Sequence, residues 1–292
     1  MLDILENRQA HSVPEALAYL EADDSAVVVA GGTDVLIKVR EGKLSGAHLV
    51  SIGGIRELKG VTRKENGDLV IGPLTTFREL EADPLIQTHI PILAGAAGTV
   101  GGPQIRAAGT VGGNICNGVT SADTASTLCA LNARLTLTSR AGVREYSIHE
   151  HYVGAGKVAL RHAELLTAIT IPRGDYEGYH GAYFKYAMRN AMDIATLGCA
   201  VSLKLNPEKT CLEDIRLACG VAAPVPIRAW NTERALQGMA VKEALAQAPE
   251  LLRREITPRD SWRASRRFRL HVAGEILVRA MRSALEEGDW VC

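Results

Sequence analysis

The chain has 292 residues, and 33 Lys and Arg against 33 Asp and Glu give it a formal net charge of zero. Its 47% hydrophobic and 23% charged residues are typical of a folded globular protein and exclude a disordered chain, and its length predicts two domains or one large domain with a subdomain. Zero net charge and 4% aromatic residues argue against nucleic-acid binding, and no run of about 18 apolar residues predicts a membrane span.

The N-terminus and the cysteines indicate the compartment. Residues 1–20 lack a basic start followed by an apolar stretch, so they predict neither a signal peptide nor a transit peptide. The six cysteines form no C-x-x-C pair, and their spacing fits neither a zinc site nor a disulfide framework. We therefore expect reduced thiols, a cytoplasmic location and no metal site.

The predicted elements mix helices and strands along the chain. Ser12 and Glu15 have the spacing of a capping box, which opens a helix that runs to Ala22. Apolar runs predict strands at 26–30, 48–52, 68–71, 131–139, 165–172, 199–205 and 215–221. Helical patterns occur at 76–82, from 93 onward, and at 232–237, 241–247 and 268–285. Residues 98–118 are too rich in glycine for a packed core element, and the turn-rich segment 173–180 predicts a domain boundary.

The first candidate binding motif follows the strand at 26–30. Gly31 and Gly32 allow positive φ and let backbone N–H groups approach a ligand closely. Thr33 and Asp34 can cap the next helix, whose N-terminus attracts phosphate. The same pattern fits an ordinary strand–turn–helix connection equally well, so the motif alone does not decide between binding and structure.

The second candidate motif is the segment 109–118, which has four glycines in ten residues and is followed by Ser121 and Asp123. Such a cluster predicts a nest of backbone donors suited to a diphosphate, with Thr110 and Asn114 adding side-chain hydrogen bonds. A structural loop could use one Gly-Gly pair but has less reason for four glycines. Binding is therefore the favoured interpretation of this segment.

Other polar segments favour structural interpretations. The segment 154–159 matches a degenerate dinucleotide fingerprint, but it follows His149 and His151 rather than an apolar strand, so it predicts a loop. The two histidines predict a surface pair rather than a metal site. The basic tract 253–269 predicts a solvated or partner-facing surface, and the segment 185–193 fits a solvated strand-to-helix connection. No G-x-S-x-G motif is present, and we name no catalytic acid or base.

Three segments together resemble one known family. They are VVVAGGTDVL at 27–36, GTVGGNICNGVTSAD at 109–123 and FKYAMRNAMDIATLG at 184–198, and the segment 261–270 is similar as well. The chain resembles the FAD-binding (medium) subunits of molybdenum hydroxylases, above all the separate FAD subunit of bacterial xanthine dehydrogenases. The resemblance covers nearly the whole chain, and the second segment is its most specific part.

The resemblance implies an α+β fold with FAD between two subdomains. This is the FAD-binding fold of the vanillyl-alcohol-oxidase (PCMH) type, followed by a C-terminal α/β domain of the CO-dehydrogenase flavoprotein type. The implied FAD-binding domain covers residues 1–176, with subdomains at about 1–57 and 58–176, and the C-terminal domain covers 177–292.

The resemblance also implies a set of site residues. The FAD diphosphate would lie on residues 28–36 and 110–114, so that a branched side chain at Gly112 would fill its cradle. Asp123 would make a polar contact, and Leu165 or Leu166 and Lys185 would face the flavin or adenine end. The expected FAD-binding residues are Val28, Val29, Ala30, Gly31, Gly32, Thr33, Asp34, Val35, Leu36, Thr110, Val111, Gly112, Gly113, Asn114, Cys116, Asp123, Leu165, Leu166 and Lys185.

The implied function is electron transfer. In such enzymes a molybdopterin-binding subunit hydroxylates the substrate, and a [2Fe–2S] subunit passes the electrons on singly. FAD here would collect them and pass a pair to NAD+ as a hydride, while the protein supplies placement and electrostatics. Lys185, Arg189 and Asp193 are candidates for tuning the flavin potential or NAD+ access. The alternatives are the FAD subunit of a related aldehyde, CO or heterocycle dehydrogenase, a self-sufficient flavin oxidase, and a flavin-free assembly protein.

Overall fold

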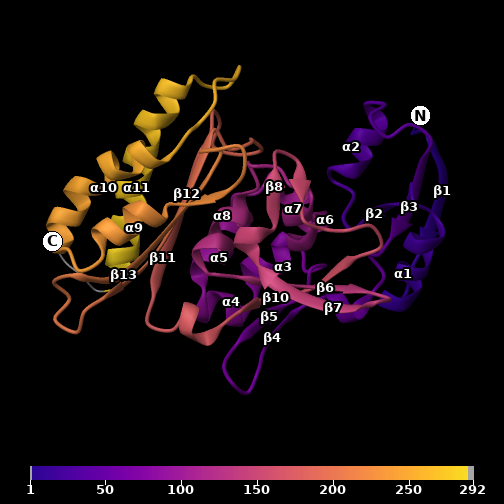
Figure 1. The fold of residues 1–292 in the computed structure, drawn as a ribbon, viewed down its shortest axis with the longest axis horizontal. Coiled ribbons are helices and arrows are strands. Elements are labelled where there is room, and N and C mark those ends of the chain that lie inside the picture. The colour runs from indigo at the N-terminus through magenta and orange to yellow at the C-terminus, as the bar shows by residue number, and fades with distance from the viewer. Residues whose placement is uncertain (1, 289–292) are drawn as a thin grey trace.

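The computed structural model describes residues 2–288, which form three units along the chain (Figure 1). The N-terminal unit, indigo in Figure 1, is a parallel three-stranded sheet in the order β1-β3-β2. Its elements are β1 (Ile4–Gln9), α1 (Val13–Ala22), β2 (Val27–Val29), α2 (Val35–Arg40) and β3 (Ala47–Ser51). Ser12 caps α1 by accepting from the Glu15 N–H, as predicted.

The middle unit is a five-stranded antiparallel sheet in the order β4-β5-β10-β6-β7. Its strands are β4 (Val61–Arg63), β5 (Leu69–Ile71), β6 (Arg134–Ser139), β7 (Gly142–Ser147) and β10 (Leu165–Ile171), with the small hairpin of β8 (Tyr152–Gly154) and β9 (Lys157–Val158). Its helices are α3 (Phe77–Ala82), α4 (Pro84–His89), α5 (Pro91–Gly98), α6 (Pro103–Ala108), α7 (Val111–Cys116) and α8 (Asp123–Ala130). Short 3-10 turns lie at Arg56–Leu58, Ile148–Glu150 and Arg173–Asp175.

The C-terminal unit is a four-stranded antiparallel sheet with helices on one face, at the orange and yellow end of Figure 1. It contains β11 (His180–Tyr186), β12 (Leu197–Leu205), β13 (Leu212–Gly220), β14 (Ile227–Arg228), α9 (Trp230–Leu236), α10 (Val241–Glu255) and α11 (Arg266–Glu287). The first seven of the nine residues of β12 are buried because both faces of the sheet are covered. Cys199 and Val201 pack with α9, α10 and α11, whereas Ala200 belongs to the core of the middle unit.

Helix α8 joins the middle unit to the C-terminal sheet. All eight of its residues are buried, and it packs against both β12 and β13. Its side chains are small apart from Leu128, so the helix and the sheet approach closely. The first residue of α8 is Asp123, and the packing of the helix therefore brings a carboxylate into the interior.

Buried arginines make further polar contacts between these two units. Arg228 on β14 pairs with the Glu233 carboxylate. It also donates to the Cys129 carbonyl, in the last turn of α8, and to the Asn132 side chain, just after that helix. Arg216 on β13 donates to the Asp175 carbonyl over 2.8 Å. The two units are thus held by hydrogen bonds as well as by apolar packing.

Most predicted elements are present, but several expectations were wrong. Segment 98–118 contains all of α6 and α7, and Val111 and Ile115 belong to the core. His151 is fully buried rather than on the surface, because its ring shares a 2.7 Å hydrogen bond with the Tyr146 hydroxyl, and burial lowers its pKa to about 4. Arg269, in the tract expected to be solvated, is 2% exposed and donates to the Thr196 carbonyl and the Ser261 hydroxyl.

Two further findings concern the predicted elements and a membrane. The helix expected at 241–247 continues through Pro249 to Glu255, and the strand that starts at His180 was not predicted. None of the helices in the described part of the chain is both long and apolar enough to cross a bilayer.

We predict that Arg228→Met destabilises the fold in a pH-dependent way. The substitution leaves the buried Glu233 carboxylate without its cation, which costs about 3–5 kcal/mol of unfolding free energy at neutral pH. Burial already raises the pKa of Glu233, and losing Arg228 raises it further. The folded state then binds a proton at higher pH than the unfolded state, so the destabilisation shrinks as pH falls through the raised pKa.

Urea unfolding at neutral and mildly acidic pH measures this effect. Arg134→Met is the matched control, because Arg134 pairs with Glu145 over 3.6 Å on the surface, with 59% of its side chain exposed. This control should lose less than about 1 kcal/mol. An Arg228→Met protein that is equally destabilised at both pH values would show that Glu233 is not the group responsible.

Candidate functional site

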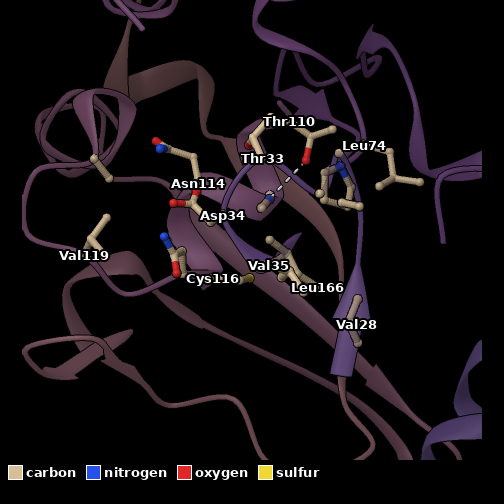
Figure 2. Close-up of a pocket in the computed structure, with 18 of the residues that line it drawn as sticks. Val28, Thr33, Asp34, Val35, Leu74, Thr110, Asn114, Cys116, Val119 and Leu166 are labelled. Atoms are coloured by element: carbon tan, nitrogen blue, oxygen red, sulfur yellow. Dashed lines mark hydrogen bonds between the residues drawn. The ribbon is translucent and has the colours of Figure 1, made fainter. Parts of the chain in front are cut away.

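A cavity of about 800 Å³ is lined by residues from all three units of the fold. Its wall includes the β2–α2 connection, the α7 segment, residues 160–166 before and within β10, and residues 192–194 between β11 and β12. Figure 2 shows that polar side chains, such as Thr33, Thr110 and Asn114, and apolar ones, such as Val28 and Leu166, both line it. Its size is that of a pocket for a large cofactor.

The β2–α2 connection is the wall with free backbone donors. The N–H groups of Gly31, Gly32 and Thr33 donate to no protein atom among residues 2–288. A Cβ atom on Gly31 would lie 1.9 Å from the Ala108 carbonyl oxygen, and Gly32 has φ +73°, so both positions require glycine. Asp34 begins α2, but its side chain makes no capping hydrogen bond. These three N–H groups are therefore available as donors at the cavity wall.

The second glycine segment differs from its prediction. Its N–H groups are used inside the protein, because Val111 donates to the Thr75 carbonyl over 3.0 Å and Gly112 to the Pro73 carbonyl over 2.8 Å. Gly113 and Asn114 donate to the side-chain and main-chain oxygens of Thr110, over 3.1 and 3.0 Å. The expected nest of free donors is therefore absent from residues 111–114, and these donors instead fix α7 beside the cavity.

Gly112 also serves packing rather than a cradle. A Cβ atom there would lie 2.5 Å from the Pro73 Cβ and 2.7 Å from its carbonyl oxygen, so a side chain would press on Pro73 and not fill the cavity. A Cβ atom on Gly113 would instead lie 3.9 Å from the Ala30 Cβ, which places this glycine opposite the first segment. The two glycines thus bring three backbone segments together at one edge of the cavity.

Asp123 places a buried, hydrogen-bonded carboxylate in the cavity wall. Its side chain is 7% exposed; Oδ2 accepts from Lys185 Nζ over 2.8 Å and Oδ1 from the Tyr183 hydroxyl over 2.7 Å. Lys185 also donates to the Thr99 carbonyl over 3.0 Å. Burial raises the pKa of Asp123, while Lys185 and Tyr183 oppose that shift. The C-terminal unit thereby supplies the charge that this carboxylate needs.

Fifteen of the nineteen residues expected at the site line the cavity. They are Val28, Ala30, Gly31, Gly32, Thr33, Asp34, Val35, Thr110, Gly112, Gly113, Asn114, Cys116, Asp123, Leu165 and Leu166. Four do not line it: Val29 and Val111 are buried in the core, Leu36 is 38% exposed, and Lys185 lies behind Asp123. Burial alone raises the pKa of the Cys116 thiol to about 12, so this cysteine is an inert part of the wall.

Several lining residues were not identified from the sequence. Lys38 donates to Asn117 over 2.8 Å, and this contact joins α2 to the end of α7. Lys38 stands four residues after Asp34, and this helical spacing was the signal available. Met192 and Ile194 also line the cavity, because no helix follows β11 and a loop passes the cavity instead. Asp193, which was named as a candidate from the sequence, lines it between them, and its carboxylate accepts from the Arg189 N–H over 3.0 Å.

Comparison with known proteins adds to this geometry. A family model described as "FAD binding domain in molybdopterin dehydrogenase" matches residues 5–174, and one described as "CO dehydrogenase flavoprotein C-terminal domain" matches 182–284. The chain is 41% identical to the xanthine dehydrogenase FAD-binding subunit of Escherichia coli O157:H7, over 98% of this chain and 97% of that protein. It is 30% identical to the glyceraldehyde dehydrogenase medium chain of Sulfolobus acidocaldarius, over 94% and 96%.

A solved structure shares the whole fold. The carbon monoxide dehydrogenase of Hydrogenophaga pseudoflava superimposes with a TM-score of 0.92 and 29% identity, covering 98% of this chain and 99% of that one. Together with the two family models, this match confirms the predicted fold class.

We predict that Gly112→Ala destabilises the ligand-free chain. Its methyl group would push against Pro73, which also lines the cavity, so the loss comes from packing and should reach about 1–3 kcal/mol. Thermal unfolding without added ligand measures it. Gly95→Ala is the control, since Gly95 lies in α5 with open space around it and should be neutral or slightly stabilising. Unchanged unfolding of Gly112→Ala would mean that the residue faces the cavity after all.

Proposed function

The chain belongs to the FAD-binding medium subunits of the molybdenum hydroxylases and binds FAD, and on that basis we propose that it is the electron-transferring FAD subunit of a xanthine-dehydrogenase-type complex. The observation that carries the proposal is the 41% identity over nearly the full length of a xanthine dehydrogenase FAD-binding subunit. The glyceraldehyde dehydrogenase medium chain, in comparison, is 30% identical.

The cavity fits FAD on its chemistry. The free N–H groups of Gly31, Gly32 and Thr33 suit the diphosphate, because two glycines leave the backbone open to its oxygens. The Lys38 ammonium lines the same cavity and is bonded to the neutral Asn117 amide oxygen, so its charge remains available to an anion. Apolar side chains such as Leu165 and Leu166 suit flat rings. These features support the FAD contacts expected from the sequence.

When bound, FAD accepts electrons singly and releases them in pairs, which is the chemistry that such a relay needs. The protein's part is to bind the cofactor, to orient it and to exclude water. Asp123 would offer its remaining lone pairs to a polar group of FAD, because a carboxylate has more acceptor positions than the two that Lys185 and Tyr183 occupy. No residue of the chain is assigned as a general acid or base.

The proposed partners follow from the family. A [2Fe–2S] subunit would deliver electrons, a molybdopterin-binding subunit would oxidise the substrate, and NAD+ would accept the electron pair. Xanthine is the proposed substrate of the complex, and its oxidation would take place on the molybdenum subunit. The related alternative is an aldehyde, CO or heterocycle dehydrogenase, to which the glyceraldehyde and carbon monoxide dehydrogenase matches point.

We predict that NADH reduces the FAD bound to this chain. Under anaerobic conditions NADH should bleach the visible flavin band of the FAD-loaded full chain, since the nicotinamide site is proposed to lie on this subunit. Dithionite is the control, because it reduces any accessible flavin. A band that dithionite bleaches and NADH leaves unchanged would contradict NAD+ as the acceptor.

The same flavin band can identify the substrate of the complex. When the chain is co-purified with its partner subunits, xanthine should bleach the band without NADH. Bleaching by an aldehyde, and none by xanthine, would support the related alternative instead.

A further inference from the structure

Tyr183 on β11 contacts the proposed FAD site through a single hydrogen bond to Asp123. We propose that Tyr183 is a positioning residue: its hydroxyl holds the Asp123 carboxylate in the orientation that binds FAD, and Gly198 on the neighbouring strand makes room for that hydroxyl. This inference rests on the proposed FAD contact of Asp123. It assigns a role in cofactor binding to a strand of the C-terminal unit.

The hydrogen bonds around Asp123 form a two-point clamp. The Tyr183 hydroxyl donates to Oδ1 over 2.7 Å and the Lys185 ammonium to Oδ2 over 2.8 Å. One donor on each oxygen fixes the rotation of the carboxylate about its last bond, which a single ion pair does not do. The side chain is 7% exposed, so water has little access to either oxygen. The carboxylate therefore presents only its remaining lone pairs to the cavity that it lines.

The strand geometry explains why both donors reach the same carboxylate. Tyr183 and Lys185 are two residues apart on β11, and alternate residues of a strand project from the same face. Ala182 and Phe184, on the other face, pack in the core of the C-terminal unit. The face of β11 that bears the two donors is thus turned toward the middle unit, where α8 begins with Asp123.

Gly198 on β12 completes the arrangement. It pairs with Lys185 across the antiparallel ladder, and a Cβ atom there would lie 2.6 Å from the Tyr183 hydroxyl oxygen and 3.3 Å from its ring. Gly198 is not among the glycines with positive φ, so its backbone does not require glycine. The space that it leaves open is the space that the Tyr183 hydroxyl occupies.

The Tyr183 hydroxyl also affects the charge of Asp123. Burial favours the neutral form of Asp123, and the two donors favour the charged form. The charged group that faces Asp123 is Lys185 on β11. The titratable groups near Tyr183, besides Asp123, are Cys199 on β12 and Cys219 on β13. Loss of the tyrosine hydroxyl removes a hydrogen bond that favours the charged carboxylate, and Lys185 is the one cation left beside it. The pKa of Asp123 should therefore rise. FAD affinity should then begin to fall at a higher pH as the solution is acidified.

The experiment measures the FAD dissociation constant of the full chain by equilibrium dialysis over a range of pH. We expect Tyr183→Phe to weaken FAD binding about tenfold at neutral pH and to shift the acid limb of the pH profile upward. It should lower the unfolding temperature of the ligand-free chain by only a few degrees, because Lys185 still pairs with the buried carboxylate. Gly198→Ala should weaken binding in the same direction, since its methyl group displaces the hydroxyl. Tyr179→Phe is the matched control, because Tyr179 donates to Asp214 over 2.6 Å in the same unit, and its FAD affinity should not change.

A double-mutant cycle decides whether Tyr183 acts through Asp123. In the Asp123→Asn background, Tyr183→Phe should cause no further loss of affinity, because the carboxylate that it positions is gone. Wild-type affinity in Tyr183→Phe, or equal losses in both backgrounds, would overturn the inference. Wild-type affinity in Asp123→Asn would instead overturn the proposed FAD contact of Asp123. A Tyr183→Phe loss of FAD affinity that is the same at every pH would assign Tyr183 a purely structural role.

Discussion

The complete burial of α8 is the constraint on which the rest of the molecule depends. A helix of small residues packed against β12 and β13 joins the cores of two units, and it places Asp123 at the cavity wall. A carboxylate in that position is stable only with a cation and donors beside it, and β11 supplies both. The cavity and the joint between the units therefore cannot be separated into independent parts.

The sequence predicts best where local chemistry decides the structure. The β-branched run before Gly31 and Gly32 predicted a strand followed by a turn, and β2 and that turn are present. The capping residues Ser12 and Thr76 likewise start helices where they were expected, because each bonds a backbone N–H three residues away. Signals of this kind lie within a few residues of the feature that they predict.

The prediction fails where partners come from distant segments. The donors of Val111 and Gly112 looked free because their acceptors on Thr75 and Pro73 belong to another part of the chain. Arg269 is polar and was expected in solvent, but the Thr196 carbonyl, which lies 73 residues earlier, provides its buried partner through the tertiary fold. Glycine composition alone also cannot distinguish a backbone that faces a ligand from one that packs against another backbone, as Gly112 does.

The backbone hydrogen bonds of the two glycine segments differ before any ligand binds. Residues 111–114 are held by hydrogen bonds to their own protein before any ligand arrives, whereas the N–H groups of residues 31–33 meet no acceptor among residues 2–288 and are open to water until a ligand displaces it. Binding therefore exchanges water for ligand oxygens on the side of residues 31–33, and no hydrogen bond of residues 111–114 has to break to admit a dinucleotide.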